Sequence, residues 1–379
     1  MLKPEAPRPG PSVVLDCRWL SFSGAGRVTE MLLRGLASAR PPGRWILWGP
    51  PETAAYVYPG AEHVLEMTKP TELSGQRGWF DVPAADLVVF MHQQRPLRQV
   101  PAVTVIHDTT PVRFNRNRVD GWYKTRFLRH VGRISRGVIT ISDFSSQCIT
   151  RDLGVAPGKI TRVGLPADGD LARRVLARRG DAPQEDVALY VGLFLPHKNL
   201  PRLLQAFGRT AFRRSGGKLL LVGGKDAAEP LRLSLDGEQR GYVTIRRECA
   251  QEELERLYAT SRFLVQPSLE EGFGLPVREA LAAGLPACVS DGGGLPEATM
   301  GFAQHFAATS VTAMSAAIDR TAEQAAQGGD HGASLSASYL ARTPTVDEFV
   351  GQVLDVVTRH LPREAEVRSG WRRRPAARG

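Results

Sequence analysis

The sequence predicts an α/β protein built from two Rossmann-like domains, and three observations support this. Short apolar, β-branched runs alternate with amphipathic helical segments, which is typical of a parallel, doubly wound sheet. This alternation stops in a charged stretch rich in Gly and Ala, 167–186, and then starts again. The length of 379 residues exceeds one ordinary core and suits two. We therefore expect an N-terminal domain over 1–168 and a C-terminal domain over 169–345, with 167–186 as a polar linker.

The N-terminal half begins with a short buried strand, expected at 12–16, which precedes a Gly-rich loop. A helix is predicted at 27–40, because Val28, Leu32 and Leu36 fall on one face at helical spacing. Apolar runs predict further strands at 45–48, 86–91, 103–107 and 137–142.

The C-terminal half repeats this rhythm. Strands are predicted at 187–194, 218–224, 242–246 and 263–267, and helices at 199–212, 252–261 and 277–284. A last amphipathic helix is predicted in the segment 346–362, and we expect it to cross back to the N-terminal domain. The basic tail, 363–379, is expected to be disordered.

The net charge of +10 favours anionic partners: nucleotides, anionic lipid surfaces or nucleic acid. An arginine-rich composition without such a meaning is the alternative. No apolar run is long enough for a signal peptide or a membrane-spanning helix. The four cysteines are far apart and form no C-x-x-C pair, which argues against a zinc site and fits a reducing cytosol. We therefore expect a cytoplasmic protein.

The most informative stretch is PSLEEGFGLPVREALAAGLPACVSDGGGLPEA, 267–298. A predicted strand ends there, a loop with two glycines follows, and Pro276 opens a helix, a position where proline loses no hydrogen bond. A helix N-terminus after such a loop suits a diphosphate. Glu271 lies just before the helix and could bind sugar hydroxyls. Glu279 lies about one turn inside it and could bind a ribose diol. The alternative is a kinked loop with two solvated acids.

This stretch resembles the donor-site signature of the retaining GT-B glycosyltransferases of family 4, P-S-x-x-E-G-F-G-L-P-x-x-E-A-x-A-x-G-x-P. The resemblance implies two Rossmann-like domains that face each other across a cleft, with the acceptor on the N-terminal side and the donor on the C-terminal side. It implies that Glu271 and the loop amides of Phe273 and Gly274 contact the donor sugar, with Leu275 beside them, and that Glu279 contacts the ribose. The matching positions are Pro267, Ser268, Glu271, Gly272, Phe273, Gly274, Leu275, Pro276, Glu279, Ala280, Ala282, Gly284 and Pro286.

Other segments are similar to the same family. In the loop expected after the first strand, Gly24 and Gly26 would approach the donor phosphates or the acceptor, and Arg27 is a candidate anion contact; a simple tight turn is the alternative. The segment TVIHDTTPVRF places His107, in a catalytic role, and Asp108 at the cleft. The segment ITISDFSSQ places Ser142 at the cleft edge, where it could also be a helix N-cap.

The segment YVGLFLPHKNL resembles the family's Y-V-G-x-x-x-P-R-K-N-L. The resemblance assigns Gly192 to a close backbone approach and Lys198 to the leaving diphosphate, and it makes Lys198 and Glu271 catalytic residues. The family usually has an arginine beside this lysine or two residues after the glycine, where this chain has His197 and Phe194. His197 could substitute in part as a donor contact, and the source of a second cationic phosphate contact stays open.

Neither a metal nor a cofactor is expected. Asp168-Gly169-Asp170 has the spacing of the Asp-x-Asp metal motif of GT-A enzymes, but it falls in the predicted linker, and we interpret it as linker. The resemblance implies that a lysine and a helix N-terminus neutralise the leaving group instead. It also implies retention of configuration, with the leaving phosphate helping to deprotonate the acceptor.

The function predicted from these features is transfer of a hexose, with mannose from GDP-mannose as the best candidate, to a glycan or lipid-linked acceptor. The product would belong to a cell-surface polysaccharide or glycolipid. A nucleotide-sugar epimerase, a phosphorylase of similar architecture and a non-enzymatic basic protein that binds nucleic acid are the alternatives. No nucleic-acid recognition signature supports the last, and we expect no nucleic-acid partner.

The segment 111–137 interleaves cations with aromatic residues, a composition that suits a lipid headgroup interface. We expect a reversible contact with an anionic membrane, with a solvated basic face over an aromatic core as the alternative. Its cations are Arg113, Arg116, Arg118, Lys124, Arg126, Arg129, Arg133 and Arg136.

Overall fold

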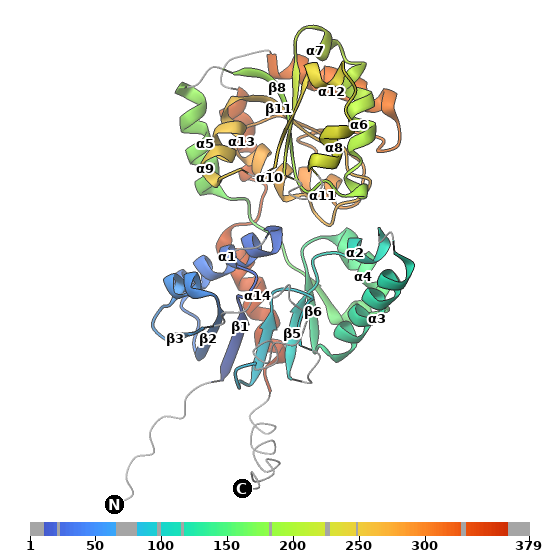
Figure 1. Ribbon diagram of the computed structural model, residues 1–379. Helices are drawn as coiled ribbons and strands as arrows, with labels where there is room; N and C mark the ends of the chain where they lie inside the picture. The colour runs from blue at the N-terminus through green and yellow to red at the C-terminus, as the bar shows by residue number, and fades with distance from the viewer. Residues whose placement is uncertain are drawn as a thin grey trace, which may run out of the picture. The chain divides into compact units, whose positions relative to one another are not determined.

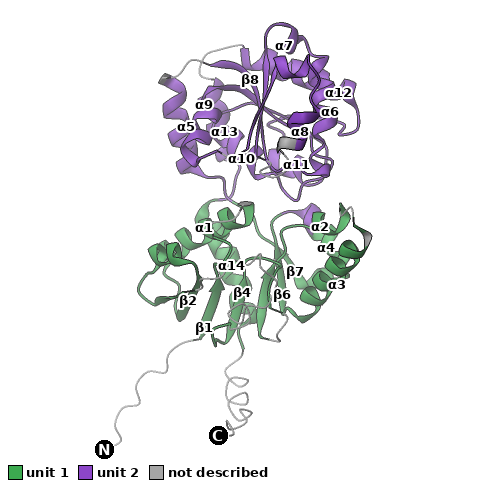
Figure 2. Ribbon diagram, in the orientation of Figure 1, with its two compact units in different colours: residues 1–141, 146–165, 345–379 green, residues 142–145, 166–344 purple. Residues whose placement is uncertain are grey.

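The computed structural model describes residues 11–20, 23–65, 82–96, 100–114, 117–181, 184–223, 228–247, 249–326 and 331–362. The chain forms two compact units, which Figure 2 colours separately. Unit 1 comprises 1–141, 146–165 and 345–379, and unit 2 comprises 142–145 and 166–344. The basic tail, 363–379, lies outside the described residues.

Unit 1 is built on a parallel sheet with the strand order β3-β2-β1-β4-β5-β6-β7. The apolar runs form strands as predicted, because their β-branched and aliphatic side chains are buried on both faces. Two edge strands were not predicted, β3 and β7, since their side chains are only partly buried and their apolar signal is weak. The strands are β1 (Ser12–Asp16), β2 (Arg44–Gly49), β3 (Ala61–Leu65), β4 (Leu87–Phe90), β5 (Ala102–Val105), β6 (Gly137–Thr140) and β7 (Ile160–Arg162).

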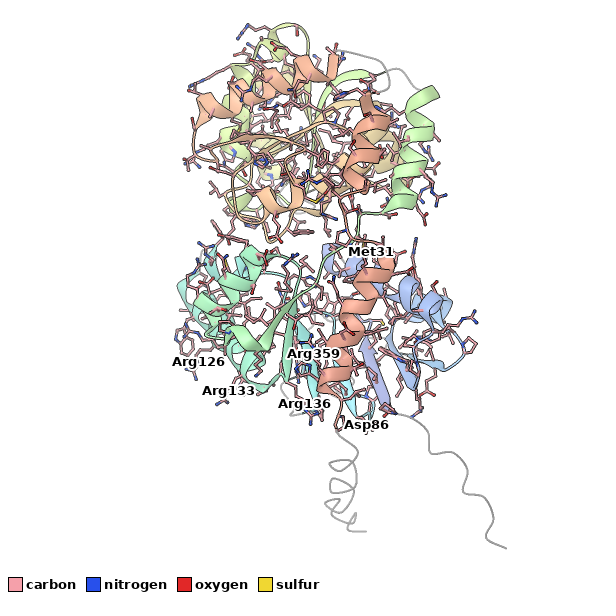
Figure 3. All side chains as sticks on the ribbon, turned by 180° about the vertical axis from the view of Figure 1, so that it is seen from behind. Met31, Asp86, Arg126, Arg133, Arg136 and Arg359 are labelled. Atoms are coloured by element: carbon pink, nitrogen blue, oxygen red, sulfur yellow. The ribbon has the colours of Figure 1, made fainter. Side chains whose placement is uncertain are left out.

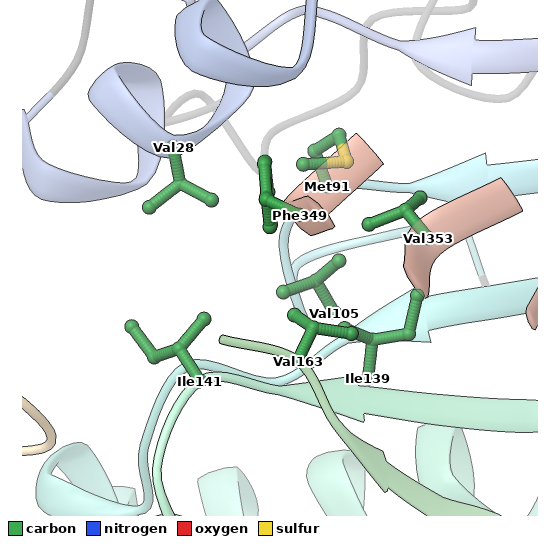
Figure 4. Close-up of a pocket in the computed structure, with 8 residues that line it drawn as sticks. All are labelled: Val28, Met91, Val105, Ile139, Ile141, Val163, Phe349 and Val353. Atoms are coloured by element: carbon green, nitrogen blue, oxygen red, sulfur yellow. The ribbon is translucent and has the colours of Figure 1, made fainter. Parts of the chain in front are cut away.

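Helices cover both faces of this sheet. Residues Ile106 and Val138 pack against the helices α3 and α4, whereas their neighbours Val105 and Ile139 face α1 and α14. Val105 and Ile139 line a small cavity together with side chains of α1 and α14 (Figure 4). All side chains that line this cavity are apolar, so the cavity offers a substrate no polar group. The helical segments are α1 (Ser23–Ala39), η1 (Pro51–Tyr56), α2 (Thr110–Arg113), α3 (Arg118–Ile134), α4 (Asp143–Leu153), η3 (Pro157–Lys159) and α14 (Val346–His360).

The C-terminal helix α14 belongs to unit 1, as the prediction of a crossover helix requires. It begins with a capping box between Thr345 and Glu348. It then packs against α1 (Figure 1), where a Cβ on Gly35 would lie 2.3 Å from Cγ2 of Val350, so glycine permits the close approach. Its last turn accepts a 2.9 Å hydrogen bond from Nη1 of Arg136 to the carbonyl oxygen of His360.

Unit 2 has a second parallel sheet, with the order β10-β9-β8-β11-β12-β13. One apolar core lies under α5, α9, α10 and α13, and another lies under α6, α7 and α12 on the opposite face (Figure 1). The strands are β8 (Glu185–Val191), β9 (Lys218–Val222), β10 (Val243–Arg246), β11 (Ser261–Gln266), β12 (Ala287–Ser290) and β13 (Gln304–Phe306). The helical segments are η4 (Pro196–Lys198), α6 (Leu200–Gly208), α7 (Ala211–Arg214), α8 (Ala228–Ser234), η5 (Gln239–Gly241), α9 (Gln251–Thr260), α10 (Leu275–Ala282), α11 (Leu295–Thr299), α12 (Val311–Ala326) and α13 (His331–Leu340).

The polar linker predicted at 167–186 is wrong, because most of it forms helix α5 (Gly169–Asp181). Leu171 and Val175, one helical turn apart, are buried in the core of unit 2. Because arginines occupy the other sides of this helix, its narrow apolar stripe was not recognised in the sequence. The Asp-Gly-Asp segment is a helix start: Oδ1 of Asp168 accepts hydrogen bonds from the backbone N–H groups of Asp170 and Leu171, at 3.0 and 2.9 Å.

Two helix boundaries also differ from the predictions. The segment expected as one helix at 199–212 is divided: α6 ends at Gly208, and the hydroxyl of Thr210 caps α7 by accepting from the N–H of Arg213. Helix α1 starts at Ser23, earlier than expected. Within the described part of the chain, no helix is both long and apolar enough to span a bilayer.

Candidate functional site

The candidate site in unit 2 lies where β8 and β11 end. Strand β11 ends at Gln266, the loop 267–274 follows, and α10 begins at Leu275. The turn η4, which follows β8, supplies His197 and Lys198. A 2.7 Å hydrogen bond from the N–H of Leu269 to the carbonyl oxygen of His197 joins the two segments. Carboxyl ends of parallel strands therefore bring residues about 70 positions apart into one cluster.

Three side chains donate to one oxygen atom of Glu271. Nζ of Lys198 lies 2.6 Å from Oε1, Oγ of Ser268 lies 2.7 Å from it, and Nε2 of Gln266 lies 2.9 Å from it. The Lys198 and Glu271 side chains are 14% and 12% exposed, so this ion pair is largely shielded from water. The donors occupy Oε1 and leave Oε2 as the atom on which this carboxylate can accept a hydroxyl of a ligand.

Sequence analysis missed Gln266 and Ser268 as partners of Glu271. Both side chains are buried, with exposures of 2% and 0%. Gln266 also donates to Oγ of Ser268 at 2.9 Å, so the two residues fix each other as well as the carboxylate. The available signal was their place at the end of a buried strand, five and three residues before the acid, where polar side chains are unusual.

A run of three glycines, 292–294, packs against the backbone of the loop that carries Glu271. Sequence analysis did not predict this role. The N–H of Gly294 donates to the carbonyl oxygen of Glu271 at 2.8 Å. Gly293 has φ +70°, and a Cβ there would lie 2.3 Å from the same oxygen. A Cβ on Gly292 would lie 2.5 Å from the carbonyl oxygen of Ser268. Only glycine fits at these two positions, so the glycine run holds the backbone of the Glu271 loop in place.

Helix α10 begins two residues earlier than predicted, and it places the two acids as expected: Glu271 before it and Glu279 within it. Its N-cap, Gly274, has φ +90°, and no side chain caps the helix. Glu279 is 6% exposed, and the hydroxyl of Tyr258 donates to its Oε2 at 2.9 Å. This contact orients the carboxylate that the resemblance assigns to the ribose.

The remaining donor-side candidates are held by packing. Phe273 is buried, with the guanidinium of Arg278 4.9 Å from its ring centre, so only its backbone is placed to meet a ligand. Leu275 is half-buried at the first position of α10. The carbonyl of Gly192 lies against Gly223, where a Cβ would come within 2.4 Å of it. Burial, aided by the charge of Lys198, lowers the pKa of His197 to about 4, which favours the neutral ring at neutral pH.

In unit 1, the structure places Gly24 and Gly26 in the first turns of α1, whereas a loop was predicted there; Arg27 lies in the helix, as predicted. Glycine is needed at 26 because a Cβ there would lie 2.4 Å from the carbonyl oxygen of Leu20. The turn at 18–20 therefore lies directly against the first turn of α1, a contact that apolar periodicity does not reveal.

His107 follows β5, and its Nε2 lies 3.0 Å from the carbonyl oxygen of Met91. This contact makes Nε2 the donor and leaves Nδ1 as an acceptor, and burial lowers the pKa of the ring. Asp108 accepts a 3.0 Å hydrogen bond from the N–H of Thr110, the first residue of α2. His92, which sequence analysis missed, stacks on Trp19 at 4.0 Å with its centre 6.1 Å from that of His107. Its position straight after an apolar run was the available signal.

Ser142 is counted with unit 2, and its side chain caps a helix, the alternative considered for it. Its hydroxyl accepts from the N–H of Ser145 at 3.0 Å, as a helix cap does, and donates to the carbonyl oxygen of Gly272 at 2.7 Å. It thus contacts the loop that carries Glu271.

Comparison with known proteins finds a related domain in unit 2. Residues 175–327, which lie in unit 2 and include Lys198, Glu271 and Glu279, match the family of glycosyl transferases group 1. The chain is 31% identical over 215 residues to O-antigen chain mannosyltransferase B of Escherichia coli, an overlap of 53% of this chain and 56% of that protein. It is 28% identical over 207 residues to O-antigen chain mannosyltransferase RfbU of Salmonella typhimurium, an overlap of 54% and 56%.

Among solved structures, the Anabaena protein HepE in complex with UDP and glucose superposes with a TM-score of 0.66 at 15% identity, over 92% of this chain and 100% of that one. In sequence, this chain spans about half the length of the curated relatives it matches. Residues 175–327 are thus similar to the glycosyl transferases group 1 family, and the two parallel α/β units have the GT-B fold.

Proposed function

We propose that this chain is a retaining glycosyltransferase, which moves a hexose from a nucleotide-diphosphate sugar to a glycan or lipid-linked acceptor. One observation carries the proposal: a largely shielded Lys198–Glu271 pair stands before the uncapped N-terminus of α10, inside the matched domain. An ammonium group and a helix N-terminus both stabilise a developing diphosphate. The acid beside them recognises the sugar that is being transferred.

Each residue of this site has a separate role in the proposed reaction. Lys198 neutralises the negative charge that builds on the leaving diphosphate as the bond to the sugar breaks. Glu271 keeps Oε1 on its three donors and accepts a sugar hydroxyl on Oε2. Glu279, oriented by Tyr258, accepts the ribose hydroxyls. The acceptor loses its proton to the leaving phosphate on the same face, so configuration is retained, and neither a metal nor another cofactor takes part.

The choice of donor and acceptor is supported by the relatives. Two of them are named O-antigen chain mannosyltransferases, and we propose mannose from GDP-mannose as the donor and a lipid-linked glycan intermediate as the acceptor. Such an acceptor keeps its lipid in a bilayer. A cytoplasmic protein that reaches it by peripheral contact with an anionic membrane completes the proposal, and nucleic acid has no part in it.

The test is titration calorimetry of the full chain with GDP-, UDP-, ADP- and dTDP-sugars, followed by product analysis with the donor that binds. We expect GDP-mannose to bind and NMR of the product to show the anomeric configuration of the donor. Binding of DNA or RNA without any nucleotide sugar would reject the proposal. Sugar conversion without transfer would indicate an epimerase, and a pyridoxal absorbance band would indicate a phosphorylase.

A matched control separates donor recognition from general damage to the fold. Glu253 lies on α9, its side chain is 38% exposed and it pairs with Arg246, outside the cluster. Glu253→Gln should leave donor binding and turnover unchanged, whereas Glu271→Gln should lower turnover by at least tenfold. Equal loss in both variants would contradict the site assignment.

A further inference from the structure

The outward face of helix α3 in unit 1 carries an unusual concentration of exposed apolar side chains. Val119, Trp122 and Tyr123 are 74%, 62% and 61% exposed. The other large exposed apolar side chains among the described residues are spread over the two units, on several different elements. Burial of large aromatic side chains is favourable, so an adjacent exposed pair on one helix indicates a surface that becomes covered.

Cations continue the same face of the helix. At 100° per residue, Val119, Trp122, Arg126 and Arg133 fall within roughly 60° of one another on the helical wheel. The opposite side is anchored, since Leu128 and Val131 are 4% and 0% exposed in the core of unit 1. The helix therefore already packs on the core through its other side, and the exposed apolar residues are not needed for that packing. The structure thus decides against the expectation that the aromatics at 122 and 123 are core.

The charge on this face is positive and uncompensated. Arg126 and Arg133 are exposed, and no carboxylate of the described residues lies within ion-pair distance of either. The acid of the first turn, Asp120, is neutralised by Lys124 at 2.7 Å. The Arg126 guanidinium lies 5.1 Å from the Trp122 ring, so cation and aromatic form one surface. Figure 3 shows Arg126, Arg133 and Arg136 in sequence along this edge of unit 1.

We propose that this face, defined as Val119, Trp122, Tyr123, Arg126 and Arg133, docks onto the headgroup region of an anionic lipid bilayer. Amphipathic indole and phenol rings favour the boundary between headgroups and acyl chains, and guanidinium groups pair with lipid phosphates. A helix face that carries two cations and no acid complements an anionic surface. The inference rests on the proposed function, because an enzyme that uses a lipid-linked acceptor must reach the membrane surface.

The experiment is co-sedimentation of the full chain with vesicles of neutral lipid or of neutral lipid mixed with anionic phosphatidylglycerol, at low and high salt. We expect binding to anionic vesicles at low salt, and loss at 0.5 M NaCl, where the Debye length is about 4 Å. Each cation near an anionic surface strengthens binding about fivefold. The double variant R126S/R133S should therefore bind on the order of 20-fold more weakly, and W122S/Y123S at least tenfold more weakly.

Matched controls come from unit 2, where Leu233 is 65% exposed and Arg214 and Arg320 are exposed cations. L233S and R214S/R320S should bind vesicles as the wild type does. Wild type that ignores anionic vesicles, or face variants that bind as well as the controls, would overturn the proposal. So would binding to neutral and anionic vesicles alike, because the arginines would then have no part in it.

Calorimetry with the nucleotide sugar separates this inference from the proposed function. The face variants should keep the donor affinity of the wild type, since no residue of the face lies in unit 2. Donor binding without vesicle binding would reject the docking face alone. Vesicle binding without any nucleotide-sugar binding would reject the proposed function and leave the docking face standing.

Discussion

Replacement of Lys198 by methionine should destabilise the chain more than replacement of Lys198 and Glu271 together. In the single variant, the Glu271 carboxylate stays in a site where it is only 12% exposed and has lost its counter-charge. Removing one partner of a buried ion pair costs about 3–5 kcal/mol. Here Ser268 and Gln266 still donate to Oε1, and we expect about 2–3 kcal/mol.

The double variant Lys198→Met/Glu271→Gln removes both charges and keeps the shape of the two side chains, so most of this cost disappears. For a unit of this size, 1 kcal/mol corresponds to about 2–4 °C in melting temperature. Differential scanning calorimetry should therefore show Lys198→Met melting roughly 4–12 °C below wild type and the double variant within about 3 °C of it. The reasoning is refuted if the double variant loses as much as the two single variants added together.

The same single variant also tests catalysis. If Lys198 neutralises the leaving diphosphate, its loss should lower kcat by about 100- to 1000-fold, the effect of removing one group that stabilises transition-state charge. Affinity for the donor should fall less, because the helix N-terminus and Glu279 still bind it. The measurement is steady-state kinetics beside titration calorimetry. A variant with unchanged kcat would show that the lysine serves only the ion pair.

Three further predictions follow from the site. Glu279→Ala should weaken donor binding with little change in kcat, and an unchanged calorimetric affinity would remove the ribose assignment. Activity should survive EDTA, and full loss with rescue by manganese or magnesium would contradict a diphosphate neutralised by Lys198. Burial, with repulsion from His107 and Arg18, lowers the pKa of His92 in the folded protein to about 3. In the unfolded chain this histidine keeps its ordinary pKa of about 6.5, so as the pH falls the unfolded chain takes up a proton on His92 before the folded protein does. Stability should drop by about 1.4 kcal/mol per pH unit for this group between pH 6.5 and 3, and His92→Gln should flatten the profile, which urea titrations at several pH values would measure.

Much of the fold was predictable because it depends on local patterns. Aliphatic runs such as 12–16 and 218–222 form strands because both faces of a parallel sheet are buried, and burial demands apolar side chains. The Glu271–Glu279 spacing around α10 follows from the same local chemistry: two glycines, a proline and a helix start. Helix α5 escaped prediction because Leu171 and Val175 form too narrow an apolar stripe among arginines, and β3 escaped because its side chains are only partly buried.

The sequence by itself determined most strands of the two sheets, the C-terminal helix and the acids on either side of the start of α10, but not the strands β3, β7, β12 and β13. Only the tertiary structure decided that Lys198, Gln266 and Ser268 share one oxygen of Glu271, and that glycines 292–294 pack beneath that loop. It also decided which side of α3 is covered, and so which aromatics remain exposed. The physical reason is range: periodicity records whether a residue is buried, whereas a hydrogen bond depends on distances of a few tenths of an ångström between segments that only the folded sheet brings together.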